Sequence, residues 1–165
     1  MLRPDGRLVR RLDSIGRMGD TTVTPDGRFV IYWRNEGDGD GGALYRAAID
    51  GKSEPVQLTD GGDGEDADPV VSPDGAQIAF RRIVRGERRV VTAPFDGAKL
   101  TAKPKSQTSG GNDQDPSWSP DGRRIAYKSG PNNNADLAVV DLERGESRIV
   151  IENSEPDTTP AWTTR

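Results

Sequence analysis

The chain has 165 residues, of which 32% are hydrophobic and 30% charged, with 20 Gly, 12 Pro and a formal net charge of −4 at pH 7. This lean, turn-rich composition argues against a helix bundle, because each Gly or Pro inside a helix costs about 1 or 3 kcal/mol, and the small net charge argues against a disordered chain. The lack of Cys and His excludes disulfides, thiolate or imidazole metal sites, and Ser-His-Asp or Cys-His catalysis within this chain.

The N-terminal residues 1–6 lack the apolar centre of a secretory signal peptide, so the chain as it stands predicts a cytoplasmic protein. No apolar run approaches the roughly 20 residues that a membrane-spanning helix needs, so no membrane span is expected. Residues 8–12 then predict one short strand that stands apart from the pattern that follows.

Three copies of a Ser/Thr-Pro-Asp-Gly turn divide the rest of the chain into repeats. Their prolines lie 48 and 47 residues apart, and an Asp-Gly turn at 50–51 and 96–97 recurs in phase with them. Pro presets φ for such a turn and Gly accepts positive φ, so we expect a structural role for the turn residues. These residues are Pro25, Asp26, Gly27, Pro73, Asp74, Gly75, Pro120, Asp121 and Gly122.

Each repeat predicts four short strands. First strands are expected at 21–24, 69–72 and 116–119; second strands at 28–33, 77–82 and 124–128; third strands at 43–49, 89–95 and 136–142; fourth strands at 56–59, 147–151 and, weakly, within 99–106. Residues 159–163 resemble one more first strand. Four antiparallel strands repeating every 40 to 50 residues are typical of a propeller blade.

The predicted fold class is therefore all-β. It is a partial β-propeller of about three four-stranded antiparallel blades, at 21–59, 69–106 and 116–151, with one extra strand at each end. Residues 1–165 are expected to form a single repeat region. A propeller needs at least about four blades to close, so we expect either part of a longer propeller or self-association that completes the ring. Light scattering coupled to size-exclusion chromatography tests the self-association.

The third repeat carries a family resemblance. Residues 115–127 read Asp-Pro-Ser-Trp-Ser-Pro-Asp-Gly-Arg-Arg-Ile-Ala-Tyr, and an apolar strand at 137–142 follows. This pattern resembles the TolB-like WD-type propeller repeat, and the resemblance covers nearly the whole chain. Val23 and Val71 stand where the family prefers Trp, and Thr24 stands where it prefers Ser. The resemblance implies an envelope-associated scaffold and, for a full-length form, the periplasm or cell envelope.

Aspartates recur near the start of each blade and are the candidate partner-binding residues. In TolB-like propellers this segment leads to the innermost strand, so the resemblance implies a position near the central channel. Such carboxylates could hold a cation or a basic peptide, or each could accept hydrogen bonds from nearby backbone N–H groups. Because they recur from blade to blade, the structural interpretation is favoured. They are Asp20, Asp66, Asp68, Asp113, Asp115 and Asp157.

Two charged features receive a surface interpretation. Residues 36–40 have the alternating acids of a calcium loop, but Ala47 stands where an EF-hand needs Glu, so no cofactor is expected and only weak Ca²⁺ binding stays open. Residues 60–68 are also acidic. Residues 81–89 place five arginines on one hairpin, which could bind an acidic partner but is interpreted as a solvated edge. No nucleic-acid partner is expected for an acidic chain.

The three tryptophans are assigned by their repeat position. Trp118 and Trp162 occupy the first-strand position, where a blade packs on its neighbour, so both are expected in the core. Trp33 ends a second strand beside the acidic loop and is expected to be partly exposed.

The leading functional hypothesis is a non-catalytic propeller module that binds a protein or peptide partner, because no catalytic constellation is found. One alternative is the propeller part of a prolyl-oligopeptidase-like serine peptidase whose catalytic domain is absent, since the chain has no His and no Gly-x-Ser-x-Gly motif. Another is the sensor part of a larger signalling protein. All three stay open from the sequence.

Overall fold

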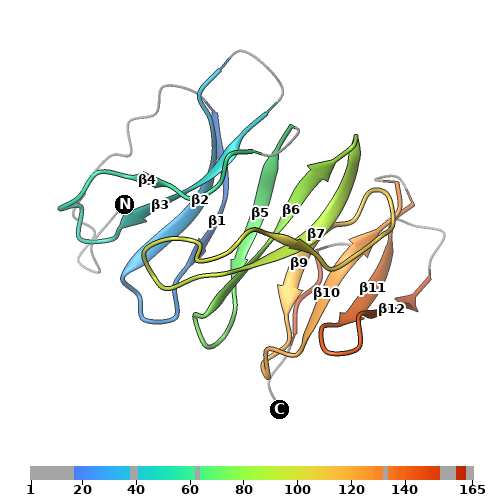
Figure 1. Ribbon diagram of the computed structural model, residues 1–165. Coiled ribbons are helices and arrows are strands. Elements are labelled where there is room, and N and C mark those ends of the chain that lie inside the picture. Colours follow the sequence, from blue (N-terminus) through green and yellow to red (C-terminus); the bar gives the residue numbers. More distant parts are fainter. Residues whose placement is uncertain (1–16, 38–40, 62–63, 132–133, 153–158, 163–165) are drawn as a thin grey trace.

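The computed structural model describes residues 17–37, 41–61, 64–131, 134–152 and 159–162. These residues form three four-stranded antiparallel sheets and contain no helix, so none of them builds a helix suited to crossing a membrane. In every sheet the strands are neighbours in chain order. Figure 1 shows the sheets following one another as twisted blades, coloured blue, green and orange to red. The predicted all-β fold with three blades is confirmed.

The strand order follows the expected repeat, and the bounds differ at several ends. Blade 1 contains β1 (Arg17–Val23), β2 (Phe29–Asn35), β3 (Ala43–Ala48) and β4 (Val56–Gln57). Blade 2 contains β5 (Asp66–Val71), β6 (Gln77–Val84), β7 (Glu87–Pro94) and β8 (Lys105–Ser106). Blade 3 contains β9 (Gln114–Trp118), β10 (Arg124–Ser129), β11 (Asp136–Asp141) and β12 (Glu146–Ile151). The first strands begin two to four residues earlier than expected, so aspartates that were expected before the strands lie inside them.

The Ser/Thr-Pro-Asp-Gly turn joins the first and second strands of each blade through a repeated hydrogen-bond pattern. In blade 2 the hydroxyl of Ser72 donates to Asp74 Oδ1 at 2.6 Å and accepts from the backbone N–H of Gln77 at 2.9 Å. The N–H of Gly75 donates to the carbonyl of Ser72 at 2.9 Å, with φ of +75° at the glycine. Thr24 with Asp26 and Ser119 with Asp121 repeat the 2.6 Å bond.

Replacing Gly122 with Val is expected to lower the free energy of unfolding by about 1–2 kcal/mol. Gly122 has φ of +69° and open space around its missing Cβ, so the cost comes from backbone strain alone. Gly122→Asn is the control, because Asn tolerates this conformation. Urea denaturation compares the two variants. Equal losses of stability in Gly122→Val and Gly122→Asn would show that backbone strain is not the cause.

Among the described residues, two core clusters lie between the blades, and a third, with Tyr32 and Tyr45, belongs to blade 1 alone. One cluster joins Ile31 and Leu44 of blade 1 to Ile78 and Phe80 of blade 2, all fully buried. The second joins blade 2 to blade 3 and includes Trp118. Because β2, β6 and β10 are central strands with apolar residues on both faces, each sheet packs on its neighbour, which is how propeller blades are stabilised.

Both tryptophans of the first-strand position reach back to the preceding blade. The indole N–H of Trp118 donates to the carbonyl of Val70 at 3.1 Å, and Trp162 donates to the carbonyl of Ser117 at 2.9 Å. The core position of Trp118 is confirmed, whereas Trp162 is half-buried. Residues 159–162 do not form the expected strand, and residues 8–12 lie outside the described residues. Trp33 is half-buried, as expected.

Candidate functional site

The first strands of the three blades carry the candidate residues. Strand β1 contacts β5, and β5 contacts β9. Each has one Asp with a left-handed backbone, with φ of +35° at Asp20, +54° at Asp68 and +53° at Asp115, and the strand pairing shifts register at these points. Asp tolerates this conformation better than most residues. The recurrence of Asp at these bulges therefore has a backbone reason.

The bulges bring three carboxylates from different blades together. Asp68 Oδ2 lies 3.5 Å from the backbone N–H of Asp115, which donates to it. Burial, then the negative charge of Asp68 and a hydrogen bond with it, raises the pKa of Asp20 above its ordinary value, and Asp115 adds to this increase. The result is an acidic cluster, Asp20, Asp68 and Asp115, at the adjoining first strands.

Cations of the second strands neutralise part of this cluster. Arg81 Nε donates to Asp68 Oδ2 at 2.9 Å, and its other end binds Glu65. Lys128 takes the equivalent place in blade 3, with its Nζ 3.3 Å from Asp115 Oδ2. Asp68 and Asp115 therefore bind mainly side chains of the second strands. The sequence had favoured hydrogen bonds from nearby backbone N–H groups instead.

The two deeper aspartates are almost completely buried. Asp66 is 0% exposed and receives two bonds from Arg82, Nε to Oδ1 at 2.6 Å and a terminal nitrogen to Oδ2 at 2.7 Å. Asp113 is 1% exposed and accepts a bond from Ser129 Oγ at 2.9 Å. The interpretation of the 81–89 arginines as a solvated edge is wrong for Arg81 and Arg82, because both are paired with buried or half-buried acids.

Several acidic residues lie outside the described part of the chain, namely Asp157 and those within 38–40 and 62–63. Within the part of the chain that the structure describes, no three acidic side chains are grouped to hold a metal ion. Weak Ca²⁺ binding at 36–40 stays a prediction.

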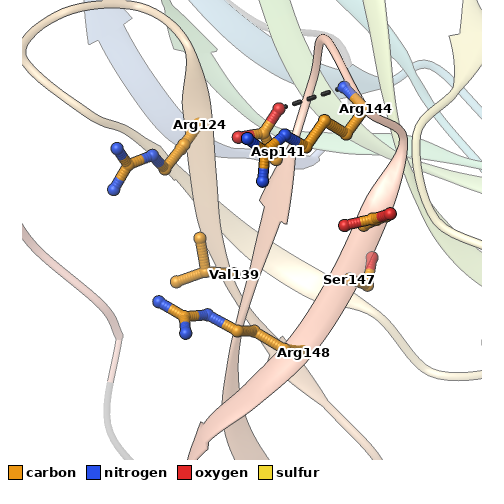
Figure 2. Close-up of a pocket in the computed structure, with 7 residues that line it drawn as sticks. Arg124, Val139, Asp141, Arg144, Ser147 and Arg148 are labelled. Atoms are coloured by element: carbon orange, nitrogen blue, oxygen red, sulfur yellow. Dashed lines mark hydrogen bonds between the residues drawn. The ribbon is translucent and has the colours of Figure 1, made fainter.

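A shallow concave surface on blade 3 was not expected from the sequence. It has a volume of about 430 Å³ and is lined by residues of β10, β11, β12 and the turn before β12. Figure 2 shows Val139 between the side chains of Arg124 and Arg148, and the N–H of Arg144 bound to Asp141. That backbone bond lowers the pKa of Asp141, and the positive charges of Arg144 and Arg124 lower it further. In the sequence, only β12 places charges two positions apart, at Glu146 and Arg148, and this signal alone does not mark the surface.

Stability is expected to fall on acidification from about pH 5 to about pH 3, because of the turn aspartates. Hydrogen bonds from Thr24, Ser72 and Ser119, then from backbone N–H groups, lower the pKa values of their partners Asp26, Asp74 and Asp121. Since the folded-state pKa lies below the unfolded one, this stability is present above the ordinary pKa and is lost as the pH falls.

Asp20 acts in the opposite direction, because its folded-state pKa is raised. Its contribution is present below the ordinary pKa and is lost as the pH rises through the folded value. The three turn aspartates outnumber Asp20, so the net slope of the free energy of unfolding against pH follows the turn aspartates. Urea denaturation at several pH values measures the slope, which should flatten in a variant with Asn at 26, 74 and 121. An unchanged slope in that variant would contradict the assignment.

No protein-family model and no curated protein sequence matches the chain. Among solved structures, it is similar to a TolB from Agrobacterium tumefaciens, with 21% identity, TM-score 0.73, and coverage of 90% of this chain and 50% of the other. TolB from Acinetobacter baumannii is 25% identical, with TM-score 0.70 and coverage of 86% and 34%.

A third similar structure is the β-propeller domain of the trilobed protease from Pyrococcus furiosus, with 18% identity, TM-score 0.59, and coverage of 82% of this chain and 42% of the other. The chain thus spans half or less of the length of these proteins. Identities this low describe the fold. The chain has the fold of TolB-like β-propellers, of which its described residues form three blades.

Proposed function

We propose that the chain is a non-catalytic propeller module that binds a basic segment of a protein or peptide at its adjoining first strands. The observation that carries the proposal is the meeting of Asp20 with Asp68 and Asp115, three carboxylates from equivalent places of three blades. Burial, then the negative charge of Asp68, raises the pKa of Asp20, and an added positive charge relieves the repulsion between the carboxylates. Complementary charge steers and orients such a partner.

The backbone supports a fixed position for these side chains. Left-handed bulges at Asp20 and Asp115 re-aim the side chains, and strands hold them more firmly than loops would. Asp20 is the exposed member of the cluster, and within the described residues it makes no ion pair at contact distance, although it shares a hydrogen bond with Asp68. A partner would therefore reach the cluster through Asp20.

Calorimetric titration with an oligolysine peptide at low salt tests the proposal, with an oligoglutamate peptide as the negative probe. Asp20→Asn is expected to weaken binding by about two- to fivefold, as for one partly screened charge pair. Glu143→Gln removes the same charge from an exposed turn of blade 3 and is the matched control. Equal losses in both variants would indicate non-specific attraction and contradict the site.

The second candidate function is the propeller part of a peptidase. It is favoured by the similarity to the propeller domain of the trilobed protease. In this case the propeller would need a hydrolase domain, because the chain has no His. Sequencing the coding region around this chain tests it, and a neighbouring Gly-x-Ser-x-Gly hydrolase domain is the expected result. A region without such a domain would contradict it.

A further inference from the structure

Asp113 has a carboxylate oxygen that nothing in the described chain satisfies. The residue is 1% exposed, and its Oδ1 accepts the single bond from Ser129. Its Oδ2 is buried and has no hydrogen-bond partner among the described residues. Leaving a buried carboxylate oxygen unpaired is costly, so such an atom requires an explanation.

The same place in blade 2 shows which group satisfies this carboxylate. Asp66 and Arg82 precede Asp113 and Ser129 by 47 residues each, so the two pairs are equivalent. In blade 2 the guanidinium of Arg82 binds both oxygens of Asp66 and lies 5.6 Å from the centre of the Phe80 ring. A planar guanidinium matches a carboxylate and stacks on an aromatic face.

Blade 3 keeps the carboxylate and the ring but lacks the guanidinium. Tyr127 is equivalent to Phe80, and Ser129, which replaces the arginine, reaches Oδ1 of Asp113 but leaves Oδ2 without a partner. The space is a cavity of about 230 Å³, and Asp113, Tyr127, Ser129 and Gly110 are among its lining residues. A Cβ at Gly110 would lie 3.2 Å from Asp113 Oδ2, so a side chain at this position would crowd the oxygen.

We propose that this cavity binds the guanidinium group of an arginine side chain from a protein or peptide partner. The guanidinium donates to Asp113 Oδ2 and lies against Tyr127, as Arg82 does with Asp66 and Phe80 in blade 2. Arg148 also lines the cavity and is exposed, so its positive charge weakens binding without closing the site. The inference goes beyond the proposed function, because the cavity is separate from the acidic cluster of the first strands.

The probe is Nα-acetyl-arginine amide, titrated into the full chain at low salt while the backbone amide signals of Gly110 and Ser129 are followed by NMR. The matched control probe is Nα-acetyl-citrulline amide, which has the same shape without the charge. Arginine is expected to shift both signals, and citrulline is expected to bind about tenfold more weakly or not at all. No shift with arginine would mean that the cavity does not bind the guanidinium, and equal shifts with citrulline would mean that the charge is not recognised; either result would overturn the proposal.

Two variants test the geometry of the cavity, so that the test can still be read if one of them does not fold. Ser129→Arg gives blade 3 the internal guanidinium of blade 2 and is expected to abolish probe binding. Asp113→Asn is expected to weaken binding about tenfold or more, because it removes the charge of the acceptor. Probe binding that is unchanged in Ser129→Arg would overturn the proposal.

The reverse exchange supplies an independent gain of binding. Arg82→Ser gives blade 2 the pair found in blade 3, so a second site is expected at Asp66, with new shifts in its surroundings. Asp20→Asn is expected to bind the arginine probe as the unchanged chain does. If Asp20→Asn weakens oligolysine binding and leaves binding of the arginine probe unchanged, the acidic cluster and the cavity are separate sites. Either proposal can then fail without the other.

Discussion

Replacing Trp118 with Ala is expected to lower the free energy of unfolding by about 3–5 kcal/mol. The side chain is 8% exposed and packs between blade 2 and blade 3 with Ile125 and Val90. Its indole N–H also holds the carbonyl of Val70 at 3.1 Å, which links the two blades directly. Truncation therefore removes apolar contacts and one hydrogen bond, and it leaves a cavity at the interface.

Two controls separate these contributions in urea denaturation followed by circular dichroism. Trp118→Phe keeps an aromatic ring but loses the hydrogen bond, so a smaller loss of about 1–2 kcal/mol is expected. Trp162→Ala removes the equivalent indole, which is half-buried, and should cost less than Trp118→Ala. A loss below about 1 kcal/mol for Trp118→Ala would contradict its place in the core.

Replacing Arg82 with Met is also expected to cost about 3–5 kcal/mol, because it leaves the carboxylate of Asp66 buried without its counter-ion. The bond to Asp66, which outweighs partial burial of the guanidinium, raises the pKa of Arg82 above its ordinary value. The pair joins β5 to β6, and a terminal nitrogen of Arg82 also reaches Asp60 at 3.1 Å.

The double variant Asp66→Leu with Arg82→Met is the decisive control. Replacing both members of a buried ion pair with apolar residues is often neutral or stabilising, so most of the lost stability should return. Denaturant midpoints of the single and double variants measure this recovery. If the double variant is less stable than Arg82→Met alone, uncompensated burial of charge is not the cause of the loss.

Local patterns in the sequence were sufficient to predict the blades. The Ser/Thr-Pro-Asp-Gly turn is built from bonds between residues two to five positions apart, as between Ser72 and Gln77, so its geometry is readable from residue types. The period of two within strands places Ile78 and Phe80 on one face, and both are buried. The starts of the first strands were predicted too late, because Asp and Gly near residues 19–20 suggest a turn although a bulged strand continues through them.

The choice of partner for each aspartate depends on contacts between distant segments. The repeat made Asp66 and Asp113 equivalent in the sequence, yet one holds a guanidinium and the other faces a cavity, because the residue across the strand pair is Arg82 in blade 2 and Ser129 in blade 3. The meeting of Asp20 with Asp68 likewise depends on how neighbouring blades pack. Short-range bonds and strand periodicity therefore specify the propeller blades in the sequence, whereas the charges and cavities depend on side chains that only packing brings together.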